Sequence, residues 1–97
     1  MTSVDYEGNT YDLSLTRAGV RAAEAQGLSS SEIADKPFSA LNLLFFAALY
    51  SKYKMNPNKS GAMLDALLDA GTVTFETLFT ELSDAYVELF NLGGSKE

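Results

Sequence analysis

The segment 37–54 constrains the fold most strongly, because apolar side chains cover most of its circumference when it is read as a helix. One stripe consists of Phe38, Leu41, Phe45, Ala48 and Leu49, and a second stripe consists of Leu43, Phe46, Ala47, Tyr50 and Tyr53. A helix that is apolar on nearly all sides is buried by several neighbours. We therefore predict a central helix over 37–54, with other elements packed on more than one of its faces.

The first fifteen residues show the alternation of a β-hairpin. A two-residue turn at Gly8-Asn9 sets Tyr6 opposite Tyr11 and Val4 opposite Leu13, so that all four side chains share one face. A hairpin is marginal in water without support. We expect this one to lie on the central helix, with later helices on the other side of that helix.

The same register would place Asp5 opposite Asp12 on the solvent face. The outer edges of the hairpin would carry unpaired backbone groups, which can pair with a second copy of the chain. The candidate self-association residues are Val4, Tyr6, Tyr11 and Leu13.

Capping signals delimit the remaining helices. Thr16 and Gly27 bracket a helix over 17–26 that is rich in small residues, and Ser29 begins a short helical turn. Two amphipathic helices are predicted over 58–70 and 75–91, and Thr74 is the expected N-cap of the second. The expected fold is α+β and predominantly helical, with an N-terminal β-hairpin packed on a bundle of about four helices. We predict one domain over 1–92 and a flexible tail over 93–97.

Composition argues against catalysis and against several kinds of ligand. The 97 residues include no His and no Cys, which removes the most common proton-transfer side chain and any thiolate metal site. The serines at 29–31 therefore lack an activating base and are better explained by capping. Glu81, Asp84 and Glu88 fall on the polar side of their helix, which favours a solvated face or an acidic surface for a basic partner over a metal site. We expect no enzyme, no metal and no cofactor.

The net charge of −6 argues against nucleic acid, because phosphate binding needs clustered cations. The longest apolar stretch, 40–50, is far shorter than the ~20 residues that cross a bilayer. No signal-peptide pattern is present at the N-terminus. We expect a cytoplasmic protein without membrane contact.

A domain of this size does not hide every face of an apolar helix, so we predict that some aromatic and methionine side chains form a surface for another protein. The helices over 37–54 and 75–91 are the expected walls of a groove. The candidate partner-binding residues are Phe38, Leu43, Phe46, Tyr50, Tyr53, Met55, Met63, Phe79 and Tyr86.

The run Tyr6-Glu7-Gly8-Asn9-Thr10-Tyr11, continued through a Thr16-Arg17 step into a helix, resembles the start of the small tail assembly chaperones of long-tailed phages and prophages. The Asp35-Lys36-Pro37 entry into a long apolar helix is also similar. The resemblance covers residues 4–54; beyond them, only the pattern of two further helices agrees. Ser14 stands where the family pattern has an acidic residue.

This resemblance implies a non-catalytic chaperone that coats the helical tape measure protein before the tail tube forms around it. It supplies no catalytic residues, and it implies absence from the finished virion and, in many members, a longer frameshifted form. The alternatives are a structural virion component, such as a connector or tail-completion protein, and a small acidic inhibitor that imitates DNA.

Overall fold

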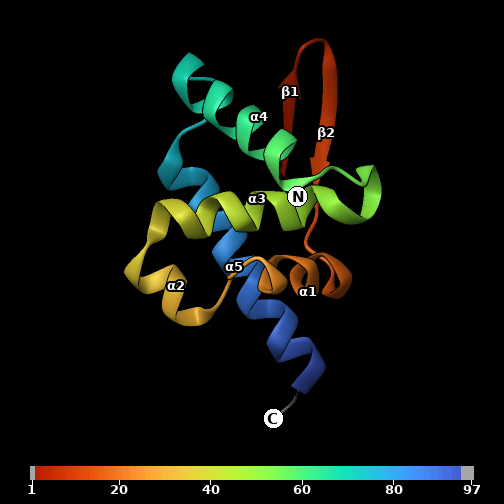
Figure 1. Ribbon diagram of the computed structural model, residues 1–97, viewed down its shortest axis with the longest axis vertical. Helices are drawn as coiled ribbons and strands as arrows, with labels where there is room; N and C mark the ends of the chain where they lie inside the picture. The colour runs from red at the N-terminus through yellow and green to blue at the C-terminus, as the bar shows by residue number, and fades with distance from the viewer. Residues whose placement is uncertain (1, 95–97) are drawn as a thin grey trace.

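The computed structural model describes the backbone of residues 2–94 and the side chains of residues 3–89. The elements are β1 (Thr2–Tyr6), β2 (Asn9–Leu13), α1 (Arg17–Ala25), α2 (Ser30–Asp35), α3 (Pro37–Tyr53), α4 (Pro57–Ala70) and α5 (Phe75–Gly94) (Figure 1). The predicted fold class, a predominantly helical α+β protein with an N-terminal hairpin, is confirmed.

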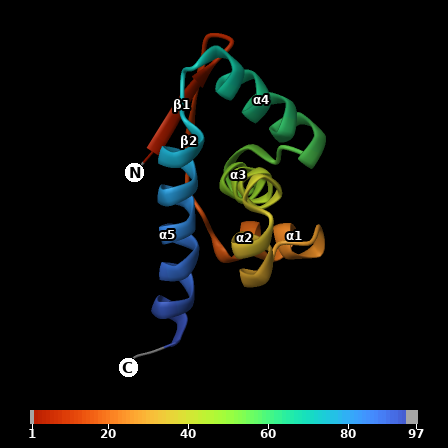
Figure 2. The ribbon, with the colours of Figure 1, turned by 90° about the vertical axis from the view of Figure 1, so that its left-hand side faces the viewer.

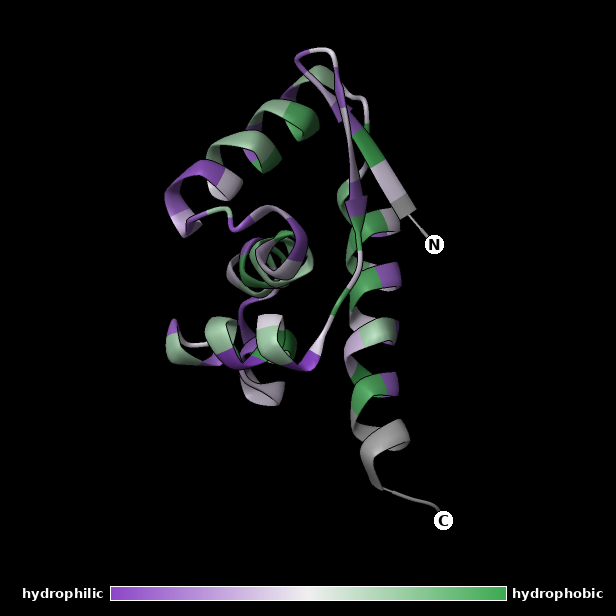
Figure 3. Cartoon of the chain, turned by 90° about the vertical axis from the view of Figure 1, so that its right-hand side faces the viewer, coloured by the Kyte–Doolittle hydropathy of each residue, from purple (hydrophilic) through white to green (hydrophobic). Residues whose placement is uncertain are grey.

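Helix α3 lies at the centre of the molecule. Figure 2 looks along its axis and shows α4 above it, α5 beside it, and α1 and α2 below it. Strand β2 also packs against α3, so the expectation that the hairpin lies on the central helix is confirmed. The expectation that the later helices lie on the opposite side is wrong for α5, because β1 and the start of α5 lie on the same side of α3 and line one hollow (Figure 3). The buried residues of α3 are Ala40, Leu41, Leu44, Phe45, Phe46, Ala47, Ala48 and Leu49.

Helices α1 and α3 approach closely because small residues line their contact. A Cβ added to Gly19 would lie 2.3 Å from the carbonyl oxygen of Ala47, which leaves no room for a side chain there. Ala23 on α1 and Ala48 on α3 are also buried. The small residues predicted for the helix over 17–26 thus lie where α1 and α3 are in contact.

Local sequence fixes where the helices begin. The hydroxyl oxygens of Thr16, Ser29 and Thr74 and the amide oxygen of Asn56 each accept a hydrogen bond from the backbone N–H three residues on. Such caps satisfy N–H groups that have no partner within the helix. The caps at Thr16, Ser29 and Thr74 were predicted from the sequence. The cap at Asn56 was not, and the helix that begins at Pro57 was predicted to begin at residue 58.

The helix ends differ slightly from the prediction. Helix α3 ends at Tyr53, and Lys54 follows in the left-handed conformation with φ of 54°. Helix α5 continues to Gly94 rather than ending near residue 91. Residues 95–97 of the predicted tail lie outside the described part of the chain. Hydrophilic residues mark the edge of α5 that faces away from α3 (Figure 3).

The hairpin turn lies one residue earlier than predicted. Glu7 and Gly8 both have positive φ, 51° and 82°, as a type I′ turn requires. The register pairs Val4 with Tyr11 and Tyr6 with Asn9, so the predicted Tyr6–Tyr11 and Val4–Leu13 pairs are wrong. The shift is by two residues, and because side chains alternate with a period of two, the predicted apolar face is kept.

The new register also removes the unfavourable acid pair. Asp5 lies opposite Thr10, whose hydroxyl donates a hydrogen bond of 2.7 Å to the Asp5 carboxylate. Asp12 is instead paired with Lys52 of α3, with Nζ and Oδ2 2.7 Å apart. Each carboxylate on the solvent face of the hairpin thus has a favourable neighbour.

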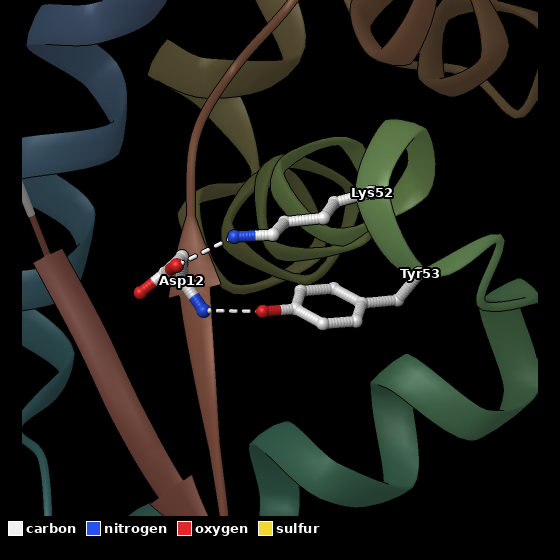
Figure 4. Close-up of polar contacts among 3 residues, drawn as sticks. All are labelled: Asp12, Lys52 and Tyr53. Atoms are coloured by element: carbon white, nitrogen blue, oxygen red, sulfur yellow. Dashed lines mark hydrogen bonds and ion pairs between the residues drawn. The ribbon is translucent and has the colours of Figure 1, made fainter.

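Helix α3 covers the outer edge of β2. The backbone N–H of Asp12 donates to the phenolic oxygen of Tyr53 at 2.9 Å, next to the Lys52 ion pair (Figure 4). The N–H of Ser14 donates to the carbonyl oxygen of Ala48. The edge of β2 is therefore blocked for pairing with another strand.

The candidate self-association residues also need correction, because their side chains pack against the core. Val4 and Leu13 are buried in the core, and Tyr6 and Tyr11 are half-buried against it. The apolar face of the hairpin is thus used within the chain. Any edge pairing is confined to β1, where a hollow of about 430 Å³ lies between Ser3 and the start of α5.

Candidate partner-binding surface

Three phenylalanine rings meet on the surface where α3 and α5 begin. The ring centroids of Phe38 and Phe75 are 4.4 Å apart, and those of Phe75 and Phe79 are 5.2 Å apart in a stacked arrangement. Phe38 is 69% exposed although it belongs to the most buried helix of the protein. We call Phe38, Phe75 and Phe79 the aromatic corner.

A groove adjoins the aromatic corner and runs between α3 and α4. It has a volume of about 280 Å³. Its lining residues are Phe38, Ser39 and Asn42 from α3 and Gly61, Leu64, Asp65 and Leu68 from α4. Because Phe38 belongs to both, the corner and this α3–α4 groove form one continuous surface.

The position of Phe38 follows from the way α3 begins. Pro37 occupies the first turn, where its missing N–H costs no helical hydrogen bond, and Phe38 comes directly after it. A side chain in the first turn projects beyond the part of the helix that its neighbours cover. Phe38 therefore contacts the start of α5 and keeps most of its ring in solvent.

Gly61 of α4 faces Asn42 of α3 across the groove. A Cβ at Gly61 would lie 3.2 Å from the side-chain oxygen of Asn42, which is exposed on α3. The floor of the groove is apolar, since Leu64 is buried and Leu68 is half-buried. A buried apolar floor with a polar rim is the form of many protein-binding sites.

The structure divides the nine sequence candidates into three groups. Phe38 is exposed, and Leu43, Tyr50, Tyr53 and Phe79 are half-buried. Of the half-buried side chains, Tyr53 is already engaged with Asp12, and Tyr50 packs edge-on against Phe46. Phe38 and Phe79 are the candidates that lie in the aromatic corner.

Four candidates are wrong as surface residues, because Phe46, Met55, Met63 and Tyr86 are all buried. Met55 and Met63 flank the bend where α4 folds back on α3, and this reversal turns both side chains inward. Tyr86 lies against α1, beside Val20. These four residues belong to the core and are no longer part of the candidate surface.

Phe75, Leu64 and Leu68 were not among the candidates predicted from the sequence. The predicted groove lay between the helices now labelled α3 and α5, whereas α4 supplies the second wall. All three missed residues belong to apolar stripes, which read as core in the sequence. Part of the apolar stripe of α4 lies at the surface because of the angle at which α4 crosses α3.

Charged side chains elsewhere form no metal site in the described residues. No group of three or more carboxylates gathers there in a way that could hold an ion. Within the same part of the chain, no helix has the length and apolar character needed to cross a membrane.

Fold and surface together define a small, predominantly helical α+β protein with an exposed apolar surface where α3, α4 and α5 meet. A family model described as a domain of unknown function, DUF5055, matches residues 2–96, and the chain belongs to this family. No curated protein and no solved structure matches it.

Proposed function

We propose that this protein is a non-catalytic tail assembly chaperone that binds and solubilises the tape measure protein of a phage or prophage in the host cytoplasm. The proposal rests on the resemblance carried by residues 6–17 and 35–37 and on one structural observation. That observation is the 69% exposure of Phe38, which joins the aromatic corner to the α3–α4 groove.

The physical match is between this surface and one side of an amphipathic helix. A tape measure protein is long and helical, so it offers apolar stripes that aggregate when they are uncovered. A helix lying in a groove buries such a stripe. Many copies along one filament would add their modest affinities by avidity. The net charge of −6 on each copy would keep the coated filament soluble.

Co-expression with the tape measure protein encoded in the same genome tests the proposal. We expect a tape measure fragment to be soluble with this chain and insoluble without it. Phe38→Ser should abolish the effect, whereas Val87→Ser should preserve it. Val87 is the matched control because it is 54% exposed but lies on α5 away from the corner.

Two results would contradict the proposal. One is a tape measure fragment that stays insoluble in the presence of the folded chain. The other is detection of the chain by mass spectrometry in purified virions at the level of a tail component, which would indicate a connector or tail-completion protein instead.

A further inference from the structure

Charges are segregated along the α3–α4 pair. Lys54 and Lys59 lie at the bend where α3 ends and α4 begins, and Lys52 beside them is paired with Asp12. The other end of α4, beside the groove, carries Asp65 and Asp69. The two ends of the helix pair thus present opposite charges to a molecule lying along them.

The acidic end borders the candidate surface directly. Asp65 lines the α3–α4 groove, and Asp69 lies one helical turn further on the same face of α4. Glu76 follows Phe75 of the aromatic corner. All three carboxylates are exposed, so they are available to charges on a bound molecule. Asp35 and Lys36, which precede α3, have opposite charges and add no net charge beside Phe38.

The walls of the groove decide which backbone conformation it can bind. Both walls are helices, so the groove offers no strand edge along which an extended segment could pair. Affinity must come from side chains that enter the groove and pack on Phe38. A helix presents side chains three and four residues apart along one face, which suits this arrangement.

Resting on the proposed function, we infer that the segment bound in the α3–α4 groove is an amphipathic helix whose apolar face is bordered by Lys or Arg. The apolar side chains fill the groove beside Leu68, and the cations meet Asp65, Asp69 and Glu76. Tape measure segments with the same apolar face but acidic borders are rejected, since like charges at an interface oppose binding.

Exposed ion pairs add little affinity in salt, because the Debye length is only about 10 Å at 0.1 M ionic strength. Their effect here is selection among apolar segments and faster association. The preference for cationic borders should therefore weaken as salt is added, whereas apolar binding to Phe38 should persist.

The test uses the full chain and three synthetic helical peptides with fluorescent labels. Two peptides share one apolar face, bordered by Lys in one and by Glu in the other. The third has the composition of the Lys peptide in scrambled order, so that charge is kept without an apolar face. Fluorescence anisotropy at low salt should show the Lys peptide binding about tenfold more tightly than the Glu peptide, a difference of about 1.4 kcal/mol.

Variants locate the effect. Asp65→Lys should reduce or reverse the preference, and Glu88→Lys, which makes the same change at an exposed site on the C-terminal half of α5, should leave it intact. Phe38→Ser should weaken both ordered peptides. Equal binding of the Lys and Glu peptides, tight binding of the scrambled peptide, or an unchanged preference in Asp65→Lys would overturn the inference.

The two proposals fail separately. If the tape measure fragment is solubilised but the peptides show no charge preference, the inference is wrong and the chaperone function stands. If the charge preference depends on Asp65 but the fragment stays insoluble, the function is wrong and the chemistry of the surface stands.

Discussion

The phenolic oxygen of Tyr53 accepts a hydrogen bond from the backbone N–H of Asp12 at 2.9 Å, across 41 residues of sequence. This contact joins the end of α3 to the outer edge of β2 (Figure 4). The rings of Tyr11 and Tyr53 also meet edge-on, with centroids 5.0 Å apart. Tyr53 therefore anchors the hairpin on the central helix by both its ring and its hydroxyl.

Replacing Tyr53 with Phe should keep the ring contact with Tyr11 and remove the hydroxyl that accepts the hydrogen bond from Asp12. We expect the free energy of unfolding to fall by about 1 kcal/mol, the usual value of a neutral hydrogen bond. Hydrogen exchange at the Asp12 amide should accelerate, because that N–H loses its partner within the chain.

Tyr50→Phe is the control for this change, since it removes a hydroxyl from the same helix while Asp12 keeps its acceptor. It should leave exchange at Asp12 unchanged. Equal exchange rates at Asp12 in the two variants would show that the Tyr53 contact does not hold the edge of β2.

Gly19→Ala should destabilise the protein by about 1–3 kcal/mol, the range for overpacking a close contact. The added methyl group would lie 2.3 Å from the carbonyl oxygen of Ala47, and backbone atoms cannot rotate away as a side chain can. Chemical denaturation of the purified variant measures the loss.

Gly61→Ala tests the same substitution within another helix. Its methyl group would meet only the exposed side chain of Asn42, which can turn aside. Alanine favours a helix over glycine by up to about 1 kcal/mol, so this variant should be as stable as the wild type or more stable. A loss at Gly61 as large as that at Gly19 would contradict the proposed difference between the two helix contacts.

Glu7→Asn should stabilise the hairpin by about 0.5–1 kcal/mol. Glu7 has φ of 51°, a left-handed conformation that Asn adopts more readily than Glu does. Glu7→Gln removes the same charge without easing the conformation and should have a smaller effect. If both variants gain equally in thermal unfolding, relief of charge and not of backbone strain is the cause.

The Lys52–Asp12 pair should make stability depend on pH in the alkaline range. The hydrogen bond and the charge of Asp12 raise the pKa of Lys52 above its ordinary value of 10.5. A raised pKa in the folded state means that the pair contributes fully below pH 10.5 and is lost as pH rises through the folded value. The difference in unfolding free energy between wild type and Lys52→Gln should shrink across that range.

Lys54→Gln controls for the removal of one cation at the same end of α3. Its difference from wild type should show a weaker dependence on alkaline pH. A difference between wild type and Lys52→Gln that is constant from neutral to alkaline pH would show that the ion pair adds no stability.

Most of the fold was predictable because it depends on local signals. Thr16, Ser29 and Thr74 each satisfy a helix N–H within a few residues, and these contacts need no other part of the chain. The central position of α3 also follows from its own residues, since a helix apolar on all sides must be enclosed.

The hairpin register shows where local signals were insufficient. Gly8-Asn9 and Glu7-Gly8 both suit a two-residue turn, and each keeps the same side chains on the apolar face. The choice between them is made by contacts with α3, where Asp12 meets Tyr53 and Lys52.

The sequence by itself determined which side chains are apolar and how they are spaced along each helix. Tertiary structure alone decided which of them stay at the surface. Phe46 and Phe38 both belong to the apolar stripes of one helix, yet Phe46 is 4% exposed and Phe38 is 69% exposed. Burial depends on how neighbouring helices cross, and the crossing of α4 and α5 over α3 covers the middle of that helix while leaving its first turn in solvent.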